Sequence, residues 1–235
     1  MPLTPEQILN LDLSYPGISF GYESWALDSY LKVLEEQIDH ARAQYRLRAE
    51  RQLSLDRKGL EHHEYGSRLS EIDEAADSQI PRFFRIGAVV SVWGLFESSL
   101  TDFALYVGQR EKVGLSFKDV RADSFRVQIE KYFEKVVRIS IPWSVDERER
   151  LGRLHELRNF LAHRNGRLMD LPPESEKRIK DLVSRMSGIV IEGSTIAVSP
   201  EYVTDAAKLV FDCVGRFNQQ LADKYVQPIP SAGTY

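Results

Sequence analysis

Three side chains suited to phosphate chemistry, Arg158, Asn159 and His163, lie within one short segment. An imidazole has an ordinary pKa of about 6.5, so His163 can accept and donate a proton near neutral pH. The guanidinium of Arg158 stays charged and can contact two phosphate oxygens together. Asn159 can hold the imidazole tautomer or the phosphate. Because a ribose 2′-hydroxyl is a nucleophile beside its own phosphate, this set could cleave RNA without a metal or other cofactor.

The spacing of these residues constrains how a site can form. An ideal α-helix turns about 100° per residue, so Asn159 and His163 share a face, whereas Arg158 and His163 diverge by roughly 140°. One straight helix therefore cannot direct both at a single phosphate. Either the helix is distorted or ends near Ala162, or a second copy of the helix completes the site across a two-fold axis.

The bounds of the helix that carries these residues can be read from the sequence. Ser144 and Glu147 have the spacing of a capping box, which predicts a helix start at about residue 145. Asn165 and Gly166 are residue types that often end a helix. We expect a motif helix over about 145–163.

Glu97 is the exception within the most hydrophobic segment of the chain. Apolar side chains surround most of the helix expected over 80–107, which indicates a central core helix. A buried carboxylate is costly unless it is paired, so we expect Arg158 to be its partner. Alternatively, Glu97 lies near solvent on a thin polar stripe with Asp102 and Gln109.

Two segments resemble a known family. Residues 154–166, LHELRNFLAHRNG, are similar to the signature of HEPN-domain proteins, an Arg, a polar residue, three further positions and a His near a helix end. Residues 89–100, VVSVWGLFESSL, resemble the neighbouring helix of that family, with Glu97 at its acidic position. The resemblance implies a metal-independent endoribonuclease, acting as a homodimer whose two motifs face one cleft, and typically part of a toxin–antitoxin or phage-defence system. One subgroup carries a Tyr, modified by its antitoxin, where Asn165 stands here, which argues against that control.

The resemblance gives each candidate residue an expected role. His163 transfers protons, Arg158 stabilises charge on the phosphoryl group, Asn159 positions phosphate or imidazole, and Glu97 orients Arg158. The expected substrate-binding residues are Arg153, Arg164, Arg167 and His155. Residues 148–167 hold six arginines and two glutamates, a net charge of +4, although the whole chain has a net charge of −4. This predicts a small basic cleft for a short or single-stranded RNA, unless the arginines form a solvated helix face with their acidic neighbours.

Two other functions stay open. The net acidity of the chain is compatible with a HEPN-like scaffold that binds RNA, a nucleotide or a protein without cutting. A third interpretation makes the chain the sensor of a defence system, contacting an antitoxin or another partner protein through a long charged arm.

Periodicity predicts a mainly α fold, a HEPN-like antiparallel helical bundle with a long N-terminal helix and a small β-hairpin insertion near 189–198. We expect an extended segment over 1–20, a single helical domain over 21–227 and a flexible tail over 228–235. Gly59 and Gly66 are expected to interrupt the long N-terminal arm. That arm could pack on the core, pair with a partner subunit or reach toward RNA.

Composition bounds the remaining possibilities. Of 235 residues, 43% are hydrophobic and 28% charged, which is ordinary for a soluble globular protein. We find no apolar run of about 20 residues and no signal pattern, so we expect a cytoplasmic protein without a membrane partner. The single Cys213 suits a reduced compartment. His62 and His63 lack a third ligand at helical spacing, so no metal site is expected.

Overall fold

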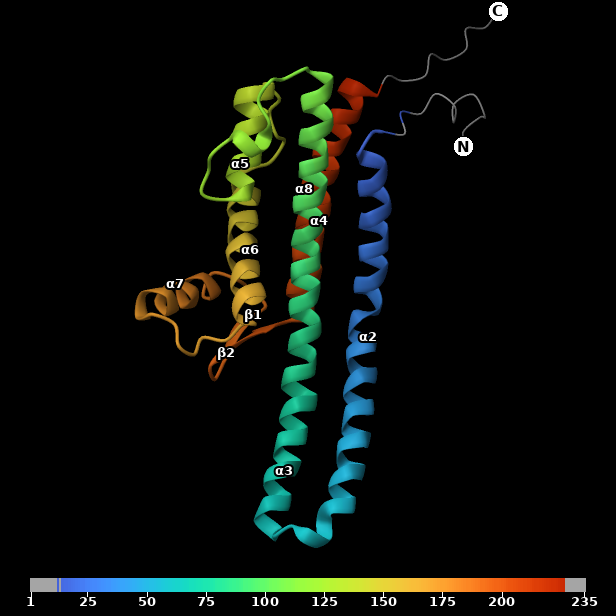
Figure 1. Cartoon of the computed structure of the whole chain (residues 1–235), viewed down its shortest axis with the longest axis vertical. Coiled ribbons are helices and arrows are strands. Elements are labelled where there is room, and N and C mark those ends of the chain that lie inside the picture. Colours follow the sequence, from blue (N-terminus) through green and yellow to red (C-terminus); the bar gives the residue numbers. More distant parts are fainter. Residues whose placement is uncertain (1–11, 13, 227–235) are drawn as a thin grey trace, which may run out of the picture. The chain divides into compact units, whose positions relative to one another are not determined.

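The computed structural model describes residue 12 and residues 14–226, and these residues are mainly helical with one small antiparallel sheet (Figure 1). The α-helices are α2 (Gly17–Asp56), α3 (His62–Glu74), α4 (Ile80–Arg110), α5 (Phe125–Lys131), α6 (Val145–Arg164), α7 (Pro173–Val183) and α8 (Pro200–Tyr225). The strands are β1 (Ile189–Glu192) and β2 (Thr195–Val198), with short 3-10 turns η1 (Arg57–Gly59) and η3 (Phe117–Asp119) and π-helical segments η2 (Ala75–Gln79) and η4 (Tyr132–Val137). The helical fold class and the hairpin over 189–198 are therefore confirmed.

The helix α2 begins at Gly17, so the end of the segment expected to be extended is helical. Residues 1–11, 13 and 227–235 lie outside the described residues, and with them most of the expected extended segment and the expected tail.

Internal contacts divide the chain into two compact units. The first unit comprises the residues up to Ala26, Trp93–Gly152 and the chain from Lys208 onward, and the second comprises Leu27–Val92 and Arg153–Ala207. A single domain over 21–227 stays a prediction.

The first unit is held together by buried aromatic side chains. The ring of Phe96 in α4 lies 5.5 Å from that of Trp143, and Phe133 lies 4.7 Å from Phe217 of α8, edge to face. The indole N–H of Trp143 donates to the backbone carbonyl of Cys213, at 3.0 Å. This bond satisfies a buried donor and fixes the chain immediately before α6.

The predicted capping box at the start of α6 is confirmed. The backbone N–H of Ser144 donates to the Glu147 carboxylate at 2.8 Å, and the backbone N–H of Glu147 donates to the Ser144 hydroxyl at 3.2 Å. Glu147 also accepts from the guanidinium of Arg216, at 2.5 Å. The start of α6 is thereby fixed at the residue that the sequence indicates.

The second unit contains a helical hairpin in which the chain leaves α2, turns through η1 and returns through α3 (Figure 1). The long arm packs through an inner face of α2, on which Leu34 and Ile38 are buried. Gly59 does interrupt the helix, as expected, but the break expected at Gly66 is wrong, because Gly66 lies inside α3. A helical glycine costs only about 1 kcal/mol, which the neighbouring turns of α3 can tolerate.

One helical stretch, His62–Arg110, is long and apolar enough to cross a membrane by length and composition. Half of its most apolar window is buried inside the protein, and the core helix of a soluble protein passes the same test. This stretch is therefore weak evidence for a membrane span, although the sequence analysis recognised no apolar run of that length.

Candidate functional site

The motif helix α6 is a regular α-helix from Val145 to Arg164. The distortion or early end near Ala162, one of the two alternatives derived from the spacing, is not observed. Arg158 and His163 therefore diverge by roughly 140° about the helix axis. A single copy of α6 does not bring these two side chains to one phosphate.

The end of α6 is set by two consecutive residues with left-handed backbone conformation. Asn165 has φ +52° and Gly166 has φ +70°, a conformation that is common just after a helix and costs least for glycine. A Cβ at Gly166 would lie 3.4 Å from both the carbonyl oxygen of Ile196 and the side chain of Leu161. These are ordinary van der Waals distances, so glycine is favoured here by the backbone conformation.

The β-hairpin anchors the chain that leaves α6. The backbone N–H of Ile196 donates to the Gly166 carbonyl at 2.8 Å, and that of Leu168 donates to the Ser194 carbonyl at 2.8 Å. Between them Arg167 forms an antiparallel bridge with Thr195. The hairpin predicted from the sequence therefore positions Arg167 and the end of the motif helix.

Arg82 of α4 supports the same helix end and was missed by the sequence analysis. Its side chain is only 7% exposed, and its Nη1 donates to the carbonyl of Asn165 at 3.2 Å. Burial, with a smaller contribution from nearby Arg167, lowers the pKa of Arg82. The signal in the sequence that could have found it is an arginine at the start of an otherwise apolar helix.

Arg158, Asn159 and His155 form a hydrogen-bonded chain on α6. Nη1 of Arg158 donates to Oδ1 of Asn159 at 2.9 Å, and Nδ2 of Asn159 lies 3.0 Å from Nε2 of His155. Because Oδ1 faces the cation, the amide directs an N–H group at His155, so Nε2 accepts and the ring proton lies on Nδ1. All three side chains are half-buried.

This chain changes the expected role of Asn159. We expected Asn159 to share its face with His163, but the imidazole that it contacts is that of His155. The physical reason is that Cα–Cβ bonds in a helix tilt toward the N-terminus, so Asn159 covers the preceding turn rather than the following one. His155, expected only to bind substrate, is thereby connected to Arg158.

The other expected site residues lie in different surroundings. His163 and Arg164 are exposed in the last turn of α6, and Arg167 is exposed just beyond it. Arg153 is half-buried on α6. The solvent-accessible end of α6 thus carries His163, the expected proton-transfer residue. Arg164 and Arg167, two of the expected substrate-binding residues, lie at the same end.

Glu97 is half-buried on α4, in the first unit, whereas Arg158 belongs to the second unit. Its pairing with Arg158 and its alternative place on a polar stripe both stay predictions.

The arginines of α6 have unequal surroundings. In the first unit, Arg148 lies 3.2 Å from Glu134 and 3.6 Å from Glu130. In the second unit, Glu156 forms an ion pair with Arg178 of α7. The positive charge of the motif helix is therefore partly neutralised near its start, while its last turn remains open to solvent.

Among the described residues, no group of three or more His, Cys, Asp or Glu side chains is arranged to hold a metal ion. Comparisons of the chain with protein-family models, with curated proteins and with solved structures found no match.

Proposed function

We propose that the protein is a metal-independent endoribonuclease of the HEPN type. The observation that carries this proposal is the arrangement along α6: Arg158 is hydrogen-bonded to Asn159 at 2.9 Å, while His163 is exposed at the helix end. A guanidinium with a fixed direction suits a phosphoryl group, and an exposed imidazole suits proton transfer to and from a substrate.

The proposed reaction uses the ribose of the substrate as the nucleophile. His163 accepts the proton of the 2′-hydroxyl, whose oxygen attacks the adjacent phosphorus as the bond to the 5′-oxygen of the next nucleotide breaks. Arg158 stabilises the charge on the phosphoryl oxygens, and protonated His163 returns its proton to the leaving 5′-oxygen. The products are a 2′,3′-cyclic phosphate and a free 5′-hydroxyl.

A homodimer completes the site in this proposal. Since α6 is regular to Arg164, Arg158 and His163 of one copy point in different directions. A two-fold axis can place Arg158 of one copy beside His163 of the other, because symmetric interfaces present the same surface twice. Glu97 is proposed to orient Arg158, and Arg153, Arg164, Arg167 and His155 to contact the RNA.

Purified protein incubated with RNA and a chelator tests this function. We expect cleavage to continue in the chelator and to yield cyclic-phosphate ends, and His163→Ala to abolish it without changing the oligomeric state. Undiminished cleavage by His163→Ala in the chelator would rule out the mechanism.

The biological role that we propose is that of a toxin or phage-defence effector in the cytoplasm. Overexpression should then slow growth, and Arg158→Ala and His163→Ala should each relieve the effect. A small protein encoded beside the chain would be the first candidate for an antitoxin.

A binding protein that does not cut RNA is the second candidate function. It is favoured by one observation: among the described residues, none forms a hydrogen bond with His163 to set its tautomer, whereas catalytic bases are usually oriented by a partner. RNA binding without any cleavage by the wild-type protein would support this candidate instead.

A further inference from the structure

The basic side chains of distal α2 and of the turn η1 that follows it form two groups. Arg42 and Arg46 face α3 and η2, where they contact Asp77 at 2.5 Å and 2.9 Å. Arg48, Arg51 and Lys58 are exposed, and among the described residues no carboxylate lies within 4.0 Å of them. Arg42 and Arg46 therefore help to hold the hairpin together. The other three, which we call the outer basic residues, make no such ion pairs within the described part of the chain.

Two of the outer basic residues, Arg48 and Arg51, share one face of α2, and Lys58 follows in η1. At about 100° per residue, Leu47, Arg51, Leu55 and Arg48 fall within an arc of about 100°. The two leucines are 66% and 70% exposed, so this arc points to solvent. The acidic residues of the same part of α2, Glu50 and Asp56, fall outside it. We call Leu47, Arg48, Arg51, Leu55 and Lys58 the outer face of the hairpin.

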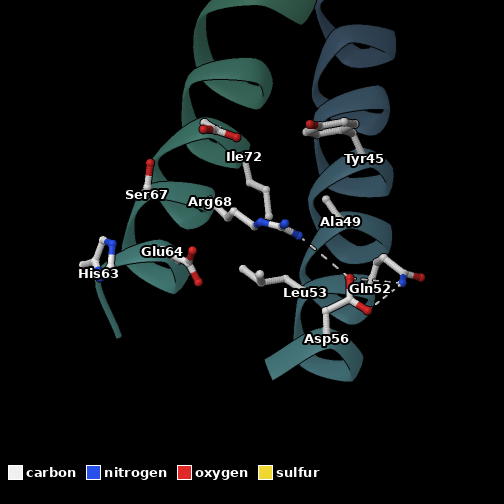
Figure 2. A pocket seen from close by; sticks show the side chains of 11 residues that line it. Tyr45, Ala49, Gln52, Leu53, Asp56, His63, Glu64, Ser67, Arg68 and Ile72 are labelled. Atoms are coloured by element: carbon white, nitrogen blue, oxygen red, sulfur yellow. Dashed lines mark hydrogen bonds and ion pairs between the residues drawn. The ribbon is translucent and has the colours of Figure 1, made fainter. Parts of the chain in front are cut away.

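The acidic side chains at the hairpin tip are directed elsewhere. Asp56 accepts hydrogen bonds from Gln52 and lies 4.0 Å from Arg68 of α3 (Figure 2). Glu61 and Glu64 form the capping box that begins α3. These contacts keep the nearby acids from neutralising the outer face.

A groove between α2 and α3 gathers acidic residues on the inner side of the tip. Its lining holds three carboxylates, those of Asp56, Glu64 and Glu71, and one guanidinium, that of Arg68, together with the apolar side chains of Leu53 and Ile72 (Figure 2). None of the three basic residues of the outer face lines this groove. The tip is therefore acidic on one side and basic on the other, although the chain as a whole has a net charge of −4.

We propose that the outer face of the hairpin binds the phosphate backbone of single-stranded RNA. From Arg48 to Asp56 the helix α2 rises about 12 Å at 1.5 Å per residue, and Lys58 follows in η1, which is enough length for several consecutive phosphates. Two separate leucines without an aromatic neighbour form too narrow an apolar face for a helix that lies on a membrane. The choice of RNA over another polyanion rests on the proposed function.

Fluorescence anisotropy with a labelled single-stranded RNA tests this surface. All proteins carry His163→Ala, so that the probe stays intact. One variant adds Arg48→Gln, Arg51→Gln and Lys58→Gln. A matched control adds Lys135→Gln, Lys177→Gln and Lys208→Gln, three exposed lysines of η4, α7 and α8, and so removes the same charge.

We expect the outer-face variant to bind RNA at least roughly 10-fold more weakly at low salt, and the control to bind almost normally. Loss of three phosphate contacts should also reduce the slope of log affinity against log salt by about 2, at about 0.7 per contact for single strands. Equal weakening in both variants, or unchanged affinity in the outer-face variant, would overturn the proposal. The proposal would also be overturned if the outer-face variant lost binding to phosphatidylserine vesicles but kept its affinity for RNA.

The two proposals fail in different ways. If the wild-type protein cuts no RNA but the outer-face variant loses RNA affinity, the endoribonuclease is wrong and the binding surface stands. If His163→Ala abolishes cleavage while the outer-face variant binds RNA normally, and the same three substitutions without His163→Ala leave cleavage unchanged, the binding surface is wrong and the enzyme stands.

Discussion

The side-chain amide of Asn159 lies 3.0 Å from Nε2 of His155, one turn earlier on α6. The same amide accepts from Arg158, so the direction of the guanidinium depends on a histidine that is not part of the Arg-polar-x3-His motif. This relationship turns His155 into a positioning residue for the proposed reaction.

Replacing His155 tests that positioning role. His155→Leu removes the acceptor and should lower the rate of RNA cleavage roughly 10-fold, because one hydrogen bond in a charged chain is worth about 1.5 kcal/mol or more. His155→Gln keeps an acceptor at a spacing that suits a Gln–Asn pair on a helix, and should restore most of the rate. Single-turnover cleavage measures both variants, and equal rates for Leu and Gln would show that the bond to Asn159 has no role.

The helix end beyond His163 should be sensitive to residue 166. Gly166→Ala places a Cβ in a left-handed conformation, 3.4 Å from the Ile196 carbonyl, and should destabilise the protein by about 1 kcal/mol or more. Asn165→Gly at the neighbouring left-handed position should leave stability unchanged or raise it slightly. Urea unfolding compares the two, and a neutral Gly166→Ala would contradict the left-handed conformation at residue 166.

Arg82 should contribute to stability through its bond to Asn165. Arg82→Leu keeps an apolar side chain at a buried position but leaves the Asn165 carbonyl without its donor, so we expect a loss of about 1.5–3 kcal/mol. Arg164→Leu, which removes an exposed cation from the last turn of α6, is the control and should cost no more than about 0.5 kcal/mol. Similar losses of stability in the two variants would mean that the hydrogen bond to the Asn165 carbonyl does not stabilise the fold measurably.

The start of the motif helix should depend on pH. The backbone N–H of Ser144, assisted by Arg216, lowers the pKa of Glu147 below its ordinary value near 4.5. A carboxyl group with a lowered folded-state pKa stabilises the fold above its unfolded pKa, and this stabilisation is lost as the pH falls through the folded value.

Glu147→Gln should therefore reduce the free energy of unfolding at pH 7 and make it fall less steeply as the pH drops below about 4.5. Glu50→Gln, at an exposed position on α2, is the matched control and should follow the wild type. Parallel pH profiles for the wild type and Glu147→Gln would contradict the capping role.

Much of this architecture could be predicted from local patterns. The capping box at Ser144, the hairpin at 189–198 and the end of α6 near Gly166 depend on residues close in sequence, and each is found where expected. Helix periodicity likewise indicates that Leu34 and Ile38 are buried.

The missed features depend on tertiary contacts or side-chain direction. Arg82 is 83 residues from the carbonyl that it supports, and no local pattern connects the two. The contact of Asn159 with His155 was not predicted, because helical spacing alone does not distinguish the preceding turn from the following one. Gly66 was expected to break a helix because its intrinsic cost was given more weight than the continuous turns around it.

Subunit complementation tests most directly the central claim, that two copies of α6 share one catalytic site. Arg158→Ala and His163→Ala, each inactive alone, are mixed under conditions that exchange subunits, and RNA cleavage is measured in a chelator. A mixed dimer then has one site with both residues intact, so about a quarter of the wild-type activity should return if subunits exchange at random. If the mixture stays inactive although exchange is complete, Arg158 and His163 do not meet across a dimer, and the account of the site is contradicted.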